Sequence, residues 1–241
     1  MTLLPSISAQ QHLPGEIRER MLALHARHFS QVRRERFLLD LAEKDWVILL
    51  RTRDGTLAGF STQKILSLAS GGRTVRFLFS GDTIVDRAHW NTPLLAGCFG
   101  HLMLRLLEVH GPGDLFWFLI SKGFRTYRFL PVFFNRFWPA PDRPTPPEMA
   151  ALLHEIAFHK FGAAYDRLAG VIRPAGGDRL APDLATIPPA RRQDPHVAFF
   201  LSRNPGFAQG DELACLAPIR PENLNAYARR VIRSTVPEWL C

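Results

Sequence analysis

One segment of the chain, residues 46 to 139, constrains the fold more than any other. It begins with short strand-like runs joined by two turn signals, Asp54-Gly55 and Gly71-Gly72. An Asp-Gly pair between two such runs is a strong signal for a β-hairpin. We therefore expect three antiparallel strands in chain order, at residues 46–50, 57–66 and 74–85.

The third of these strands is interrupted by a glycine. Ser80-Gly81-Asp82 separates the alternating residues 74–79 from Thr83-Ile84-Val85. A glycine inside a strand often marks a bulge, where pairing breaks and backbone groups are left free. The sequence therefore predicts a bulge within this strand.

A helix and a buried strand follow the bulged strand. Thr92 is suited to cap the helix, and Pro93 to occupy its first position, where no amide donor is needed. The apolar stripe of the helix ends near Gly111-Pro112-Gly113. Leu115 to Ile120 is a continuous apolar run, which is typical of a strand buried on both faces.

The flanking regions complete one domain of residues 1–241. Apolar spacing predicts one or two helices over residues 16–42. Residues 139–195 form a predicted insertion of a proline-rich linker, a helix at 149–168 and an exposed loop at 173–193. We expect the aromatic residues 127–138 to be helical on both sides of Pro131, and the chain to close with two strands, 196–202 and 213–219, and a helix at about 223–233.

Composition bounds the location and the partners. The chain has 46 % apolar residues, yet no apolar run approaches the length of about 20 that spans a bilayer. We find no signal-peptide pattern, and three widely spaced cysteines suit a reducing compartment, so we expect a cytoplasmic protein without a membrane span. The formal charge of +8 favours encounter with acidic partners. No nucleic-acid motif accompanies it, which makes nucleic acid an unlikely partner.

This order of elements resembles the GNAT superfamily of N-acyltransferases. The resemblance implies an α/β (α+β) fold with a mixed, mainly antiparallel central sheet flanked by helices, a bulged fourth strand and a splayed fifth strand. In that family the helix after the bulged strand presents amides to the pyrophosphate of the coenzyme, and the splayed strand leaves a cleft for the acyl arm. Residues 74–85, the helix starting at Thr92, and residues 115–121 match these parts. The glycines of the family's pyrophosphate loop are absent from Trp90-Asn91-Thr92-Pro93-Leu94-Leu95-Ala96-Gly97.

The resemblance also implies a donor. It is an acyl-coenzyme A or the phosphopantetheine thioester of an acidic acyl carrier protein, used as a co-substrate, with no tightly bound cofactor. The predicted donor contacts are Ile84, Val85, Asn91, Thr92 and Ser121, although Ser121 also fits a helix cap. The many aromatic residues between 116 and 138 suggest a pocket for a long acyl chain, as in relatives that make N-acyl amino acids or acyl-homoserine lactones. Residue by residue, the same aromatics fit a core.

Acyl transfer to an amine needs a base, donors for the carbonyl oxygen and an acid for the thiolate. Asp82 at the bulge is the first candidate base, acting directly or through water, or else a turn aspartate satisfied by local amides. His89 is a second candidate base and Tyr127 a candidate acid, unless Tyr127 is a buried structural residue. His25 and His28 share one face of the first helix, which in the family covers the acceptor site.

These residues suggest an acyltransferase that moves an acyl group from a thioester to an amine of a small molecule or natural-product intermediate. Direct attack is favoured because no nucleophile–base pair is apparent. The alternative is a non-catalytic domain of the same shape, which binds a ligand or regulates, with a degenerate coenzyme site. No metal site is expected, because His154 and His159 are five residues apart and so point to different sides of a helix.

Overall fold

The computed structural model describes residues 2–111 and 113–240. In this part of the chain, nine strands form one sheet in the order β11-β1-β3-β4-β5-β6-β10-β8-β7. Neighbouring strands are antiparallel except for the pairs β5–β6 and β1–β11. The strands are β1 (Leu3–Ala9), β3 (Trp46–Thr52), β4 (Leu57–Ser70), β5 (Arg73–Val85), β6 (Leu115–Ser121), β7 (Tyr165–Asp166), β8 (Val171–Ile172), β10 (Glu212–Pro218) and β11 (Glu238–Leu240).

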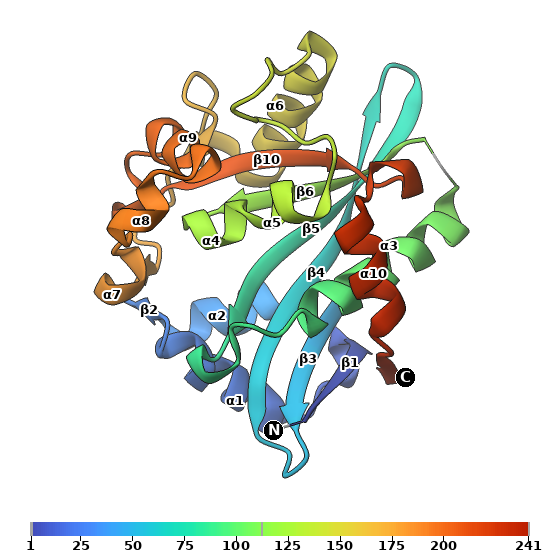
Figure 1. The fold of residues 1–241 in the computed structure, drawn as a ribbon, viewed down its shortest axis with the longest axis vertical. Coiled ribbons are helices and arrows are strands. Elements are labelled where there is room, and N and C mark those ends of the chain that lie inside the picture. The colour runs from blue at the N-terminus through green and yellow to red at the C-terminus, as the bar shows by residue number, and fades with distance from the viewer. Residues whose placement is uncertain (1, 112, 241) are drawn as a thin grey trace.

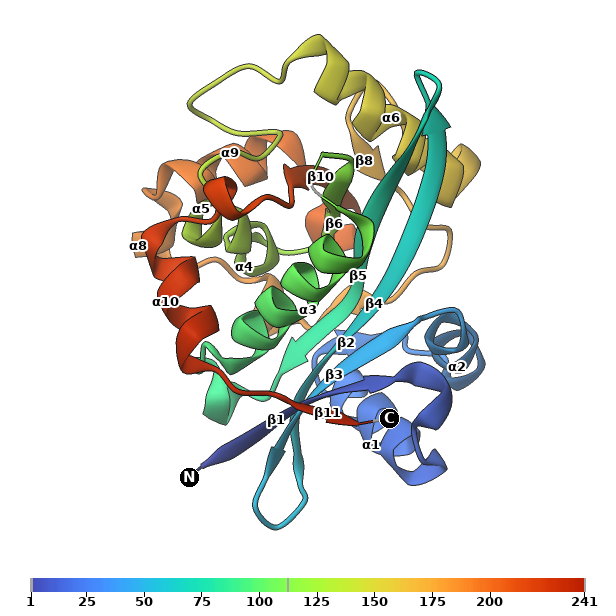
Figure 2. The same cartoon turned by 90° about the vertical axis from the view of Figure 1, so that its right-hand side faces the viewer.

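Helices cover both faces of this sheet (Figures 1 and 2). One face, here called the α1 face, carries α1 (Gly15–Ala26), α2 (Arg34–Ala42) and α6 (Pro147–Phe161). The opposite face, here called the α3 face, carries α3 (Leu94–His110), α4 (Phe124–Tyr127), α5 (Phe129–Phe133), α9 (Pro195–Arg203) and α10 (Ala226–Ser234). The shorter elements are β2 (Phe29–Ser30), β9 (Arg179–Leu180), α7 (Pro182–Ala185), α8 (Pro189–Arg192), and the 3-10 turns η1 (Gln10–His12), η2 (Arg87–His89), η3 (Gly162–Ala164), η4 (Phe207–Gln209) and η5 (Pro221–Asn223).

Successive side chains along the central strands point to opposite faces of the sheet, so the core is divided between the two faces. Leu78 of β5 packs on the α3 face, whereas its neighbours Phe77 and Phe79 pack on the α1 face. Val47 and Ile48 of β3 divide in the same way. Strands with large apolar side chains on both sides must be covered on both faces, so this pattern fixes a three-layer structure.

The sheet confirms the predicted fold class, with a bulge in β5 and a gap beside β6. If the strands of the large sheet are counted along the chain, β5 is the fourth and β6 the fifth. The meander, the helix after it and the buried strand are found where the sequence predicts them. The assignment of residues 139–195 as an insertion stays a prediction.

Some local predictions were wrong or incomplete, and the helix expected at 149–168 already ends at Phe161 as α6. Residues 196–202 are not a strand but part of α9, because the Asp194 side chain caps the amides of His196 and Val197 and Pro195 occupies the first turn. The strand β1 was not predicted, and it pairs along its full length with β3. The helix α3 begins at Leu94 with Pro93 at the cap, one residue later than expected, and residues 134–138 after α5 are not helical.

The packing of α3 against α10 depends on a close approach at Gly97. A Cβ atom at this position would lie 2.0 Å from Thr235 Oγ1 and 2.6 Å from Thr235 Cβ. Thr235 is buried, and its hydroxyl donates to the Val231 carbonyl at 2.9 Å, so its side chain has little room to move. Only glycine at position 97 therefore permits this contact.

We expect Gly97→Ala to lower the free energy of unfolding by about 1–3 kcal/mol, because overpacking outweighs the better helix propensity of alanine. Urea denaturation of the purified variant measures this change. The matched control is Gly15→Ala, since nothing lies within 4 Å of a Cβ atom placed there. Equal midpoints for the two variants would contradict the prediction.

Candidate functional site

The bulge lies where the sequence predicts it. Ser61 of β4 pairs with Thr83 and Gln63 pairs with Ser80, so Gly81 and Asp82 together oppose a single residue. A Cβ atom at Gly81 would lie 2.6 Å from the hydroxyl of Thr62, which explains the glycine. The additional residue turns the Asp82 side chain toward the α1 face, where it lines a cavity.

A gap opens between β5 and β6 next to the bulge. The two strands pair in parallel from Arg76↔Leu115 to Ser80↔Leu119, and in the described part of the chain the register ends there. Beyond Ser80, β5 continues to Val85 along β4 only. One edge of residues 81–85 therefore faces the gap without a strand partner.

The register of β4 and β5 shows which backbone groups face this gap. The Asp86 amide donates to the Ala58 carbonyl at 2.7 Å, which makes that pair the hydrogen-bonded kind. Because the two kinds of pair alternate along an antiparallel ladder, Val85 and Thr83 direct their backbone groups away from β4 and into the gap. Ile84 directs its own toward Phe60 of β4.

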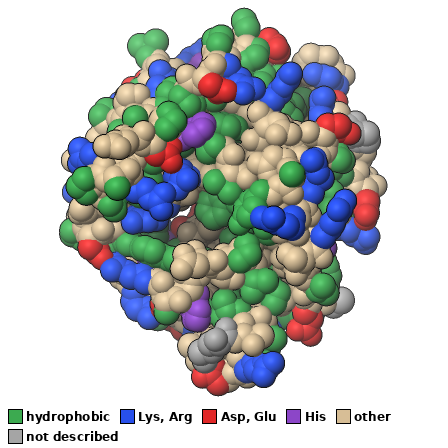
Figure 3. Space-filling model, in the orientation of Figure 1, with side chains coloured by type: hydrophobic (Ala, Val, Ile, Leu, Met, Phe, Trp, Pro, Cys, Tyr) green, Lys and Arg blue, Asp and Glu red, His purple; other side chains and the backbone are tan. Residues whose placement is uncertain are grey.

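Two cavities lie on opposite sides of the gap. The cavity on the α1 face has a volume of about 440 Å³ and a polar, charged lining that includes His25, Asp82 and Lys122. The cavity on the α3 face is smaller, about 40 Å³, and mostly apolar, with Phe99, Trp117, Phe129, Phe133 and Phe134 in its wall. Thr83 and Thr126 line both cavities. Figure 3 shows the hollow at this position, bordered by basic side chains on one side and apolar ones on the other.

A hydrogen-bonded chain of side chains runs along the floor of the α3-face cavity to Thr83. The Trp117 indole donates to Ser80 Oγ at 2.9 Å, and the Ser80 hydroxyl donates to Gln63 Oε1 at 2.8 Å. Gln63 Nε2 then donates to Ser61 Oγ, which is 2.7 Å from Thr83 Oγ1. An indole can only donate, so Ser80 Oγ accepts from Trp117; between Ser61 and Thr83 either hydroxyl can be the donor.

Five charged or titratable side chains meet at the floor of the α1-face cavity. His25 Nε2 lies 2.7 Å from Asp178 Oδ2, and its Nδ1 lies 3.6 Å from Asp82 Oδ2. Lys122 Nζ lies 3.1 Å from a carboxylate oxygen of Asp178 and 3.1 Å from one of Glu212. These residues come from α1, β5, the ends of β6 and β10, and the loop before β9, so distant parts of the chain build one cluster.

Burial and pairing shift the pKa values in this cluster in a consistent way. Burial raises the pKa of Asp82, and His25 opposite it does not cancel this effect. Burial lowers the pKa of His25, but Asp82 and Asp178 outweigh it, so the net shift is upward. Burial would raise the pKa of Asp178, yet His25 and Lys122 hold it well below its usual range. Asp178 is therefore ionised at neutral pH.

The three predicted catalytic residues do not lie together. Asp82 lines the α1-face cavity, as expected for a group that faces an acceptor. Tyr127 is fully buried and lines neither cavity, because its hydroxyl donates to the Pro139 carbonyl at 2.8 Å; burial raises its pKa. His89 lies in η2 and also lines neither cavity. Of these three residues, only Asp82 lines a cavity, whereas Tyr127 makes a structural contact.

Of the predicted donor contacts in strands β5 and β6, one faces the gap and two do not. Val85 faces the gap, and its carbonyl accepts a hydrogen bond from the Trp90 indole at 2.8 Å. Ile84 does not face the gap, since its side chain is buried on the α1 face and its backbone faces β4. Ser121 is buried and lines neither cavity, because alternation along β6 turns it to the α3 face beside Cys215.

Asn91 and Thr92 lie before α3, near its free amides. Asn91 is exposed, and Thr92 Oγ1 accepts from the Leu94 amide at 3.4 Å. This contact and the missing amide of Pro93 reduce the number of backbone donors that the start of α3 offers to an anion.

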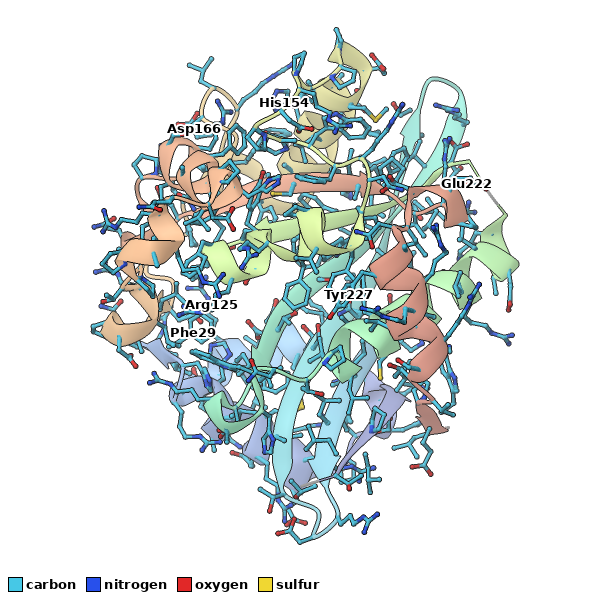
Figure 4. All side chains as sticks on the ribbon, in the orientation of Figure 1. Phe29, Arg125, His154, Asp166, Glu222 and Tyr227 are labelled. Atoms are coloured by element: carbon cyan, nitrogen blue, oxygen red, sulfur yellow. The ribbon has the colours of Figure 1, made fainter. Side chains whose placement is uncertain are left out.

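Sequence reasoning missed Lys122, Asp178 and Glu212. They are isolated charges in the sequence, and only the pairing of β6 with β10 and the return of the loop before β9 bring them together. It also missed Arg125, whose guanidinium lies 4.8 Å from the Trp90 ring centre, with Arg87 at 5.9 Å from the same ring. Figure 4 labels Arg125 and Phe29 beside the opening of the gap.

Among the described residues, no helix is long and apolar enough to cross a bilayer. No group of three or more His, Cys, Asp or Glu side chains among them is arranged to hold a metal ion.

Part of the chain is similar to known structures at low sequence identity, whereas no protein-family model and no curated protein sequence matches the chain. A probable N-acyltransferase from Enterococcus faecalis V583 is 14 % identical, with a TM-score of 0.44 over 57 % of this chain and 33 % of its own. A GNAT-family N-acetyltransferase from Escherichia coli in complex with coenzyme A is 14 % identical, with a TM-score of 0.38 over 51 % of this chain and 65 % of its own. An aminoglycoside acetyltransferase from an uncultured soil metagenomic sample, in complex with sisomicin, is 16 % identical, with a TM-score of 0.34 over 48 % and 76 %.

The chain spans less than two thirds of the first two of these structures. The likeness concerns the fold. The fold predicted from the resemblance to the GNAT superfamily is the one observed, with the bulge, the gap and the intervening helix in the expected order.

We expect Lys122→Met to lower the free energy of unfolding by about 3–5 kcal/mol, because it leaves the carboxylates of Asp178 and Glu212 without their cation. Chemical denaturation at neutral pH measures the loss. The control is Arg105→Met, since Arg105 and its partner Glu108 are both exposed and such pairs contribute little. A stable Lys122→Met variant would mean that the cluster is not held by this lysine.

Proposed function

We propose that this protein transfers an acyl group from a thioester to an amine, by direct attack within the gap between β5 and β6. The observation that carries the proposal is the meeting of two cavities at Thr83 and Thr126, with one cavity on each face of the sheet. A donor and an acceptor can then reach one point from opposite sides. The carboxylate of Asp82 lies beside that point.

The small apolar cavity on the α3 face suits the donor. The backbone groups of Thr83 and Val85 that face the gap can pair with the amides of a pantetheine arm, as an added strand would. The four aromatic rings of Trp117, Phe129, Phe133 and Phe134 can contact the methylenes of an acyl chain, each of which gains about 0.8 kcal/mol on burial. This favours an apolar acyl group, as in the long-chain N-acyl amino acid type.

The charged cavity on the α1 face suits the acceptor. Asp82 can receive the ammonium group of a small-molecule amine. After loss of a proton, the amine nitrogen forms a bond to the carbonyl carbon, and the C–S bond then breaks to release the thiolate. The Thr83 amide facing the gap can stabilise the oxyanion. When Ser61 donates to it, the Thr83 hydroxyl can give its proton to the thiolate and take one from the nitrogen, the role that the sequence predicts for Tyr127.

We expect Asp82→Asn to reduce kcat by about 100- to 10,000-fold while the affinity for the donor stays unchanged, because the acceptor loses its carboxylate but the α3-face cavity is intact. The change in kcat is measured as turnover of acetyl-, octanoyl- and palmitoyl-coenzyme A with a panel of primary amines. The affinity for the donor is measured by calorimetry. Asp54→Asn, in the hairpin turn between β3 and β4, is the control. Failure of the wild-type protein to consume or bind any thioester would disprove the proposal.

Arginine side chains at the mouth of the gap can take the donor's phosphate. Arg125 from α4 and Arg87 from η2 flank the Trp90 ring, and Asp183 pairs with Arg87 only. Burial, together with Arg87 and Arg191, lowers the pKa of Arg125, as expected where guanidinium groups gather. A phosphate on the pantetheine arm occurs both in coenzyme A, where it is part of the pyrophosphate, and in an acyl carrier protein, where it is a phosphodiester, so this site fits either donor.

We expect Arg125→Gln to weaken binding of phosphopantetheine about tenfold and to leave binding of pantetheine, which lacks the phosphate, unchanged. Isothermal titration of both ligands provides the comparison, with Arg105→Gln as the control. Parallel titrations with coenzyme A and a phosphopantetheinylated carrier protein distinguish the two donors. Equal losses for both ligands would point to a folding defect and not to a phosphate contact.

One contact favours the alternative of a non-catalytic ligand-binding domain. The Trp90 indole occupies the Val85 carbonyl, a group that a pantetheine arm would use. A protein of this second kind would bind its ligand equally well as wild type and as the Asp82→Asn variant, and neither would show turnover.

A further inference from the structure

The imidazole of His25 is held in one orientation by its surroundings. It lies on α1 with 4 % of its surface exposed. The Phe29 ring stacks on it at 4.5 Å between centroids, and the Phe37 ring meets it edge-on at 5.3 Å. A ring fixed in this way keeps each nitrogen directed at a constant neighbour.

Asp178 determines which nitrogen carries the proton. Its carboxylate lies 2.7 Å from His25 Nε2, and Lys122 keeps it ionised. A carboxylate can only accept a hydrogen bond, so Nε2 carries the hydrogen in the neutral ring, and Nδ1 has the lone pair. Lys122 is itself held between Asp178 and the buried end of Glu212, which fixes the carboxylate in turn.

The second nitrogen of His25 has no protein partner. Nδ1 is buried without a hydrogen bond among the described residues, and it lies 3.6 Å from Asp82 Oδ2, which is too far for a direct hydrogen bond. Both atoms belong to residues that line the α1-face cavity. An ammonium group on the cavity side of this pair, about 2.8 Å from each atom, could donate one N–H to each.

We propose that His25 Nδ1 accepts the proton of the acceptor amine while Asp82 binds the ammonium group, and that Asp178, Lys122 and Glu212 position His25 for this role. The inference rests on the proposed acyl transfer and extends it, because it separates the residue that binds the amine from the residue that deprotonates it. One ammonium proton moves to Nδ1. The nitrogen lone pair then forms the C–N bond, the C–S bond breaks, and a second N–H proton reaches the thiolate through the Thr83 hydroxyl.

The charges around His25 determine the pH dependence. Burial and Lys122 lower the pKa of the ring, whereas Asp82 and Asp178, which face it, raise this pKa. Asp40 raises the pKa of Asp82 itself, and Lys44 lowers it. The net upward shift places the acid limb of kcat/KM above the usual histidine value of about 6.5. Removal of the Asp178 charge takes away a contribution that favours the imidazolium form, so it should move this limb to lower pH.

The variants His25→Gln and Asp178→Asn test the proposal. We expect His25→Gln to lose about 100- to 10,000-fold in kcat and to lose the acid limb, with donor affinity unchanged. Asp178→Asn should keep measurable turnover with its acid limb displaced to lower pH. His28→Gln is the matched control, because His28 is also buried but bonds the Leu24 carbonyl and does not line the cavity.

Two further measurements separate a chemical role from a folding defect. Exogenous imidazole should restore part of the turnover of His25→Ala. Ring ¹⁵N NMR of the wild-type protein should show His25 as the Nε2–H tautomer at high pH, and Asp178→Asn should populate both tautomers. Wild-type kcat and an unchanged acid limb in His25→Gln would overturn the role of His25 while acyl transfer stands, whereas absence of turnover in the wild type would refute the acyl transfer itself.

Discussion

The end of the parallel pairing between β5 and β6 is the constraint on which the site depends. Up to Ser80 the two strands share a ladder, and after it the bulge at Gly81 and Asp82 directs β5 along β4 alone. The same step frees the backbone of Thr83 and turns a carboxylate to the α1 face. If β5 and β6 stayed paired along their full length, the sheet would separate the two cavities.

Burial of the charged cluster next to the gap costs desolvation free energy, so every charge in the cluster needs a partner within it. Each ion loses its water, and only the mutual contacts of Lys122, Asp178 and Glu212 offset that loss. A fold that needed only stability would do as well with apolar residues of similar volume. The retained charges are consistent with a site in which one histidine must keep a fixed tautomer, because an ionised and immobile carboxylate imposes it.

Much of the fold could be predicted from local patterns, and much of the site could not. The turn at Gly55, the glycine interruption at Gly81 and the amphipathic helix before Leu115 are short-range signals, so they locate the meander, the bulge and the helix. The assignment of residues 196–202 as a strand failed because seven apolar-rich residues fit either period, and the cap at Asp194 decided for a helix.

The sequence by itself determined the three-strand meander, the bulge and the candidate carboxylate at Asp82, because each depends on neighbours a few residues away. Only the tertiary structure decided what Asp82 faces. His25 and Asp178 are 153 residues apart in the chain, and they meet because α1 and the loop before β9 cover the same face of the sheet. The tertiary structure also assigned Tyr127 to a carbonyl away from both cavities, since a hydroxyl that is buried must find a partner wherever packing places one.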